Sequence, residues 1–195
     1  MIRPQDVLEF WFAGEQTQFR VIWFRADEAF DASCARFGAA LHQARLGTLD
    51  HWGTTPHGAL ALIVLLDQMS RNLYRGAKEA FSADQKARAL AREMVARGFD
   101  QVLHPMQRMF VYLPFEHSED LADQDESVRL FETLRLWLGD NAIEQAHQHR
   151  DLIRRYGRFP YRNATLGRES TVEELHYLAW SGSDGLHRSS GNSAR

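Results

Sequence analysis

Two residues suited to acid–base chemistry stand side by side in the middle of the chain. The segment 109–120 begins as an apolar run and continues directly into Glu116 and His117. A carboxylate beside an imidazole is the basic equipment for moving protons near neutral pH. We therefore treat Glu116 and His117 as candidate catalytic residues. Capping of a helix end or pairing with arginine is the structural alternative.

A second polar group follows another apolar run. Asp67, Arg71 and Arg75 are spaced four residues apart, so on a helix they share one face, and Asp67 can pair with Arg71. Asp67 is a third candidate catalytic residue, and the two arginines are candidates for binding an anion. The alternative is an ordinary ion pair within a helix, worth about 0.3–0.5 kcal/mol on a surface.

A third group lies toward the C-terminus. His149 falls on the apolar stripe of the segment 141–156, where a histidine is more often a satisfied core residue than a catalyst. Arg158, Arg162 and Arg168 follow in a loop. Guanidinium forks suit carboxylates and phosphates, so Arg158 and Arg162 join His149 as candidate binding residues. The alternative is that the loop arginines tie carbonyls and helix ends together.

No metal or other cofactor is expected. Glu144 with His147, and Glu173 with His176, match the Glu-x-x-His motif of di-iron helical bundles. However, both glutamates also fit as the third residue of a helix-capping box, and His147 lies off the apolar stripe. The sequence contains no P-loop, no G-x-G-x-x-G run and no His-Glu-x-x-His spacing.

The composition of the 195 residues is that of an ordinary soluble protein, with 44% apolar and 25% charged residues. The net charge of -3 argues against a general nucleic-acid binder. The longest apolar run, 59–66, is too short to cross a membrane, and the N-terminus does not resemble a signal peptide. Cys34, the single cysteine, lies on an apolar helical stripe and is expected in the core. We expect a cytoplasmic protein without a membrane partner.

The elements that must hold these residues are helices, because apolar residues recur with helical spacing and strand signals are scarce. The spacing predicts an all-α fold of eight or nine helices packed as antiparallel hairpins. Their expected ranges are 4–12, 18–24, 27–46, 56–74, 82–97, 104–113, 118–138, 141–156 and 170–180. We expect a single domain over 1–180. The polar segment 181–195 is expected to be a disordered tail.

Several helix ends are marked by specific residues. Thr55 is a candidate N-cap in front of Pro56, and Ser118 is expected to open the helix after Glu116. Capping boxes are predicted at 82–85, 141–144 and 170–173. Pro114 lacks an N–H, so the helix before it is expected to end near Leu113 and to leave Glu116 and His117 at a kink or break.

Together these segments resemble a known family. The stretches 4–12, 66–76, 112–120 and 158–168 resemble the uncharacterised bacterial family catalogued as domain of unknown function 924 over about 3–180. The resemblance implies an all-helical fold similar to tetratricopeptide-repeat proteins in how its hairpins stack, although the sequence shows no 34-residue repeat. Met69 and Ser70 depart from the family's usual Phe-Pro, and Tyr161 stands where His is usual. The family brings no function with it.

The sequence leads to two hypotheses. In the first, the candidate residues form one polar pocket, and the protein is an enzyme or a binder that acts on a small anionic molecule by acid–base chemistry. In the second, the protein is a tetratricopeptide-repeat-like scaffold that binds a protein partner in a groove, and the charges are a structural network. The first predicts a closed polar pocket, and the second predicts an exposed groove with an apolar patch.

Overall fold

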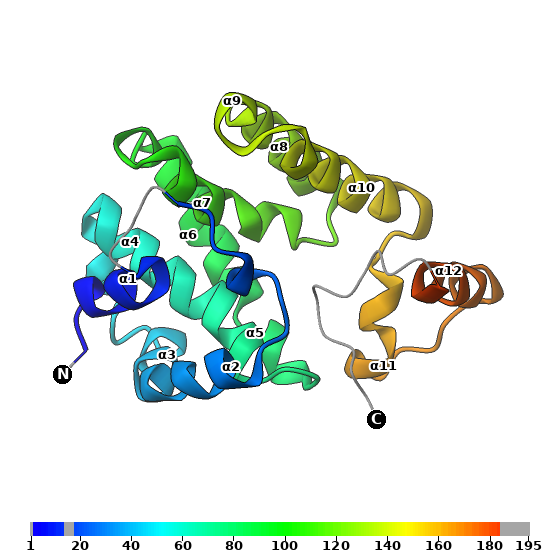
Figure 1. Cartoon of the computed structure of the whole chain (residues 1–195), viewed down its shortest axis with the longest axis horizontal. Coiled ribbons are helices and arrows are strands. Elements are labelled where there is room, and N and C mark those ends of the chain that lie inside the picture. The colour runs from blue at the N-terminus through cyan, green and yellow to red at the C-terminus, as the bar shows by residue number, and fades with distance from the viewer. Residues whose placement is uncertain (1, 14–17, 184–195) are drawn as a thin grey trace.

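The computed structural model describes residues 2–13 and 18–183, and within these ranges it contains helices and no strand. The predicted all-α class is confirmed. Figure 1 shows the helices. They are α1 (Pro4–Phe12), α2 (Glu28–Cys34), α3 (Gly38–Arg45), α4 (Pro56–Ile63), α5 (Ser70–Leu73), α6 (Asp84–Ala96), α7 (Pro105–Glu116), α8 (Leu121–Glu132), α9 (Arg135–Leu138), α10 (Asp140–Tyr156), α11 (Asn163–Leu166) and α12 (Val172–Ser183).

The helices fall into three groups in space (Figure 1). The first seven helices form one side of the molecule, α8 and α10 lie along each other, and α11 and α12 lie on the opposite side. Helices α8 and α10 are antiparallel, because Asp125 near the start of α8 contacts Arg154 near the end of α10, while Glu132 contacts His147. Tetratricopeptide-like stacking of the other helices stays a prediction.

The core is built around α4 and α7. Every residue from Gly58 to Ser70 is buried, which confirms the core helix expected from the apolar run. Trp11 and Trp23 both pack against Phe110 of α7, with the Trp23 and Phe110 rings perpendicular at 4.8 Å between centroids. Cys34 is fully buried, and burial raises the pKa of its thiol to about 12, so it is the plain core residue that was expected.

The start of α4 follows the prediction. The Thr55 hydroxyl accepts a hydrogen bond from the Gly58 N–H at 3.2 Å, and Pro56 is the first helical residue. A Cβ at Gly58 would lie 2.2 Å from the carbonyl oxygen of Trp52, so only glycine fits there. This tight turn sets the direction in which the buried helix enters the core.

Two of the predicted capping boxes are wrong and one is shifted. Helix α6 begins at Asp84 after Ala83, and α10 begins at Asp140 after Gly139, without a side-chain cap in either case. At the start of α12 the box is formed one residue later than predicted. Thr171 Oγ1 accepts from the Glu174 N–H, and the Glu174 carboxylate accepts from the Thr171 N–H.

The expected break before Glu116 is also wrong. Helix α7 continues through Pro114 to Glu116, because surrounding core contacts outweigh the one hydrogen bond that proline cannot make. The helix ends at Glu116, and His117 is its C-cap. Helix α8 then starts at Leu121 with Asp120 as its N-cap, accepting from two backbone N–H groups, while Ser118 instead donates to Asp123 at 2.8 Å.

The end of α12 corrects the predicted tail boundary. The helix runs to Ser183, so residues 181–183, which were expected to belong to the disordered tail, are helical. The rest of the expected disordered tail, 184–195, lies outside the described residues. In the part of the chain that is described, no helix is long and apolar enough to cross a membrane.

Candidate functional site

A π-helical turn holds the first site residue. Residues Val64–Met69, between α4 and α5, form a π-helix inside an otherwise continuous helical run. This wider turn contains Asp67, whose side chain is completely buried. The apolar spacing predicts one regular helix over 56–74, and no local pattern marks the π-turn. Such turns are uncommon and recur at functional sites.

Arg71 is the centre of a buried charge network. Its guanidinium lies 3.1 Å from an Asp67 carboxylate oxygen, which confirms the predicted pairing. It also makes two 2.9 Å hydrogen bonds to Asp84, the first residue of α6. Two carboxylates therefore neutralise this arginine, and the carboxylate of Asp84 is further favoured by the positive N-terminal end of its helix.

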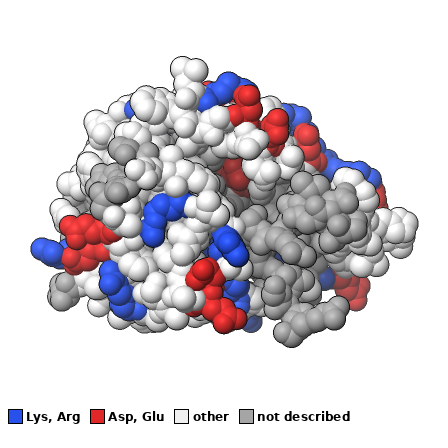
Figure 2. Space-filling view, viewed as in Figure 1, with Lys and Arg blue, Asp and Glu red and all other residues white. Residues whose placement is uncertain are grey.

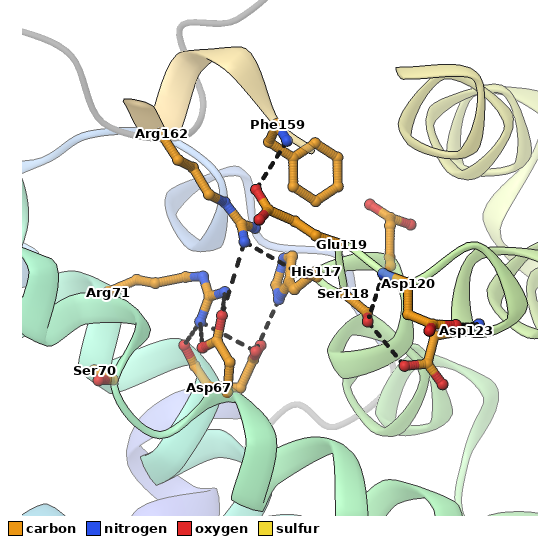
Figure 3. Close-up of polar contacts among 12 residues, drawn as sticks. Asp67, Ser70, Arg71, His117, Ser118, Glu119, Asp120, Asp123, Phe159 and Arg162 are labelled. Carbon is orange, nitrogen blue, oxygen red and sulfur yellow. Dashed lines mark hydrogen bonds and ion pairs between the residues drawn. The ribbon is translucent and has the colours of Figure 1, made fainter. Parts of the chain in front are cut away.

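Asp67 also orients His117. The Asp67 carboxylate lies 2.8 Å from Nδ1 of His117, as the dashed line in Figure 3 shows. Burial alone would raise the pKa of Asp67, but Arg71 and His117 together hold it well below its ordinary value. An ionised carboxylate only accepts hydrogen bonds, so Nδ1 must carry the proton. In neutral His117 the lone pair is then on Nε2, which has no hydrogen-bond partner among the described residues.

His117 is held in this neutral form. Burial lowers the pKa of its imidazole, the charge of Arg71 lowers it further, and the opposing effect of Asp67 is smaller. The residue sits at the end of α7, and Arg162 fixes its backbone by donating from Nη1 to the His117 carbonyl oxygen at 3.0 Å (Figure 3). A neutral imidazole with a free Nε2 and a fixed ring can accept a proton.

Glu116, the neighbouring residue, has the opposite protonation tendency. Its side chain is buried, and burial raises its pKa to about 7. Its one polar contact among the described residues is His149 Nδ1, at 3.4 Å. That nitrogen also lies 2.9 Å from the carbonyl oxygen of Gln145, and burial lowers the pKa of His149 to about 4. Glu116 therefore keeps its proton up to about pH 7, and it lies beside two imidazoles whose pKa values burial lowers.

Arg162 is the least neutralised buried cation of the site. Only 7% of it is exposed, and its nearest carboxylate is Asp84 at 4.0 Å. Its guanidinium stacks over the rings of Phe159 and Phe81, at 4.4 and 4.8 Å. Within residues 2–13 and 18–183, nothing accepts a hydrogen bond from its buried Nε–H. Burial lowers the pKa of Arg162, yet an arginine stays protonated at physiological pH, so the site keeps this positive charge.

These side chains meet in one cavity of about 490 Å³. It lies between the three groups of helices. Its wall includes six of the eight predicted site residues together with a large apolar surface. The lining residues are Phe19, Trp23, Phe24, Arg25, Gln68, Arg71, Asn72, Arg75, Gly76, Ala80, Phe81, Met109, Leu113, Glu116, His117, Phe131, Leu138, Asn141, Ala142, Gln145, His149, Tyr161, Arg162 and Thr165.

The two remaining predicted residues lie elsewhere. Asp67 is not in the wall but directly behind His117. Arg158 does not line the cavity, because both ends of its guanidinium bind the Glu174 carboxylate of α12. Arg75 does line it, but as the partner of Asp31, with hydrogen bonds of 2.6 and 2.9 Å.

The Glu-x-x-His motifs have separate structural contacts. Glu173 pairs with Arg155, and His147 contacts Glu132 of α8. In the described ranges, no three histidine, cysteine, aspartate or glutamate side chains gather in a way that could hold a metal ion. These motifs take no part in the cavity.

Sequence reasoning missed the acidic partners of the arginines. Asp31 and Asp84 are remote in sequence from Arg75 and Arg71, and Asp84 was taken for part of a capping box. No local pattern marks such a pairing. Phe19, Trp23 and Phe24 also line the cavity, and nothing in their spacing along the sequence indicated this position.

The surface on the side seen in Figure 2 shows no gathering of one charge sign. Lysine and arginine side chains are interspersed with aspartate and glutamate. The concentration of arginines is thus a property of the cavity rather than of this face.

Comparison with known proteins points to one family. The model of a family described as bacterial protein of unknown function (DUF924) matches residues 7–182. The solved structure of a protein of unknown function from Agrobacterium tumefaciens is 39% identical, covers 90% of this chain and 96% of its own, and superposes with a TM-score of 0.80. No curated protein matches the sequence.

Proposed function

Since this chain belongs to the DUF924 family of bacterial proteins of unknown function, we propose its function from the geometry of the cavity: it binds a small anionic molecule, on which His117 acts as a general base. The observation that carries the proposal is the 2.8 Å contact between Asp67 and His117 Nδ1. It leaves the Nε2 lone pair of a cavity-lining imidazole free. A carboxylate that orients an imidazole in this way is a recurring device for general-base catalysis.

The other residues have complementary roles. Arg162 supplies the charge that holds the anion, and Glu116 supplies a proton-donating group close to neutral pH. Asp67 is a positioning residue, because it orients His117 and does not itself contact the ligand. Arg71 is also a positioning residue, because it is paired with Asp67 and Asp84. His149 limits the space beside Glu116. Enzymes that transfer protons often place a proton acceptor and a proton donor in the same cavity, as His117 and Glu116 are placed here.

The proposal is tested by a screen of small carboxylates, phosphates and sulfates for stabilisation against heat. Hits should stabilise the parent protein and Arg155→Gln, which removes an exposed arginine far from the cavity, but not Arg162→Gln. Conversion of each hit is then followed by ¹H NMR. Replacing a general base costs about 10²- to 10⁴-fold in rate, so His117→Gln should lose conversion by that order.

Two results decide against parts of the proposal. If a compound stabilises the parent protein and all variants equally, it does not bind in the cavity. Hits that depend on Arg162 but are never converted would assign the protein as a binder and remove the role of His117 as a base.

The protonation of His117 is a prediction that needs no ligand. We expect ¹⁵N NMR of the histidine side chains to show His117 at pH 7 as the neutral Nδ1–H tautomer, because ionised Asp67 accepts that proton. Asp67→Asn should change the tautomer, since an amide can donate to Nδ1. A charged or Nε2–H imidazole in the parent protein would contradict the proposed base.

A second candidate function is a protein-interaction scaffold. It is favoured by exposed apolar side chains on α9, where Leu136 is 98% exposed and Trp137 62% exposed. The double variant Leu136→Ser, Trp137→Ser should then abolish capture of a partner while leaving the anion screen unchanged.

A further inference from the structure

The arginines of the cavity are unevenly neutralised. Four of them line it, namely Arg25, Arg71, Arg75 and Arg162. Arg25 is exposed to solvent. Three carboxylates pair with Arg71 and Arg75: Asp67 and Asp84 bind Arg71, and Asp31 binds Arg75. A ligand with a single negative charge can pair with the one buried arginine that these carboxylates leave, whereas the second charge of a dianion would be buried without a partner.

Within the described part of the chain, Arg162 is the buried arginine without a carboxylate at hydrogen-bond distance, since Asp84 lies 4.0 Å away. Arg71 and Arg75 each bind a carboxylate at hydrogen-bond distance, and Arg25 is exposed to solvent. Arg162 is buried, and among the described residues its one hydrogen bond goes to the His117 carbonyl. A buried guanidinium with unused donors is an anion-binding group, and its planar fork matches a carboxylate.

Much of the remaining wall is apolar. Phe19, Trp23 and Phe24 form one part of it, with the ring of Phe19 stacked on Phe24 at 5.7 Å and perpendicular to Trp23 at 5.9 Å. Leu113, Phe131 and Leu138 come from three other helical segments and line the same space. The volume of about 490 Å³ is typical of cavities that enclose an organic molecule and far exceeds the needs of an inorganic ion.

We propose that the ligand is a monocarboxylate with an apolar body, its carboxylate bound at Arg162 and its apolar part lying against the aromatic and aliphatic wall. This inference rests on the proposed function, because it names the class of the anionic molecule. A phosphate monoester is disfavoured, since its second charge meets no second free buried cation. Burial raises the pKa of Glu116 to about 7, so below that pH its protonated carboxyl does not repel the ligand's carboxylate.

The test uses octanoate and 4-phenylbutanoate as probes and isothermal titration calorimetry with the parent protein. Octanamide, octyl phosphate and the series acetate, butanoate, hexanoate are the comparisons. We expect octanoate to bind at least tenfold more tightly than octanamide or octyl phosphate. Affinity should rise about fourfold for each added methylene that is buried.

Variants locate the charge contact. In Arg162→Gln the ratio of the affinities for octanoate and octanamide should fall close to one. Arg162→Lys should retain part of the preference for octanoate, and Arg155→Gln should retain all of it. If Arg162→Gln does not fold, the parent protein still decides, because bound octanoate should shift the ¹⁵N resonance of the buried Arg162 Nε–H and octanamide should not.

The outcomes separate this inference from the proposed function. Equal binding of octanoate and octanamide, or no gain with chain length, overturns the monocarboxylate. Tighter binding of octyl phosphate in an Arg162-dependent manner overturns the monocarboxylate but keeps the anion site. If none of the carboxylates, phosphates and sulfates of the wider screen binds, both are overturned.

Discussion

At the scale of single residues, the cavity combines two kinds of buried charge. Arg71 is held by two carboxylates in good geometry and has the features of a structural ion-pair centre. Glu116 is a buried carboxyl without a cationic partner among the described residues, and its pKa is raised to about 7. The first arrangement stabilises the fold, and the second costs stability whenever Glu116 is ionised. Mutations at the two positions should therefore have opposite effects.

We expect Arg71→Ala to lower the free energy of unfolding by about 3–5 kcal/mol, because it leaves the buried Asp67 and Asp84 carboxylates without their cation. Urea unfolding at pH 7 measures the change. Arg155→Ala is the control, since its pair with Glu173 is exposed and screened by solvent and should contribute far less. If both variants lose similarly little free energy of unfolding, water screens the Asp67 and Asp84 carboxylates once Arg71 is removed.

We expect Glu116→Gln to stabilise the protein at pH 8 and to change little at pH 5. The folded protein keeps a proton up to pH about 7 that the unfolded chain releases near its ordinary pKa of 4.5. Stability contributed by this proton is complete below pH 4.5 and is lost as the pH rises through 7. The full shift corresponds to at most about 3 kcal/mol. Unfolding in urea at both pH values measures the gain.

Glu126→Gln is the control for that experiment, because Glu126 is paired with Arg129 at the surface of α8. Its effect should not increase between pH 5 and pH 8. An equal loss of stability for Glu116→Gln at the two pH values would show that the Glu116 carboxyl makes favourable contacts in its ionised form.

At the scale of helices, the ends of α7 and α8 decide where the reactive side chains lie. Helix α7 runs through Pro114, so Glu116 is still helical and His117 is the first residue beyond the helix. The chain then turns sharply, and Asp120 caps α8 by accepting from the N–H groups of Ala122 and Asp123. The π-turn between α4 and α5 supplies Asp67, whose carboxylate contacts the His117 ring. Each catalytic candidate thus sits at an irregular point of a helix.

We expect Asp120→Ala to cost about 1 kcal/mol, the usual loss when a helix N-cap is removed. The measurement is the free energy of unfolding of the variant and the parent. Asp125→Ala, on the same helix, removes only exposed contacts to Arg150 and Arg154 and should cost less. If Asp125→Ala lowers the free energy of unfolding as much as Asp120→Ala does, the effect of Asp120→Ala does not come from the lost N-cap.

At the scale of the whole molecule, one part of the cavity wall depends on contacts that tie the C-terminal segment to the loop between α7 and α8. Glu119 accepts from the Phe159 N–H at 2.8 Å and binds the Arg168 guanidinium through both oxygens (Figure 3 shows the Phe159 contact). Arg158 continues the link to Glu174 of α12. These contacts bring Tyr161, Arg162 and Thr165 to the cavity wall, the rest of which comes from earlier parts of the chain.

We expect Glu119→Gln to loosen the segment 158–183 without unfolding the rest. Hydrogen–deuterium exchange should become faster in α11 and α12 and stay unchanged in α4 and α6, because the lost ion pair and hydrogen bond connect only the C-terminal segment. The exposed substitution Glu173→Gln is the control. Faster exchange throughout the molecule would show that α11 and α12 unfold together with the core.

Much of the fold could be predicted from local patterns. Helical spacing of apolar residues indicated the all-α class, the apolar run 59–66 indicated the most buried helix, and Thr55 with Pro56 marked its start. Each of these signals depends on neighbours within about four residues, and such neighbours are visible in a sequence. The same holds for Asp67 and Arg71, which are four apart and do pair.

Tertiary structure alone decided the rest. The π-turn, the passage of α7 through Pro114 and the start of α6 and α10 without caps depend on core packing, which outweighs local preference at these points. The pairing of Arg71 with Asp84, of Arg75 with Asp31 and of Arg158 with Glu174 joins residues from different helices. An arginine's chemistry can be read from the sequence, but whether it faces a cavity or a carboxylate depends on which helices meet.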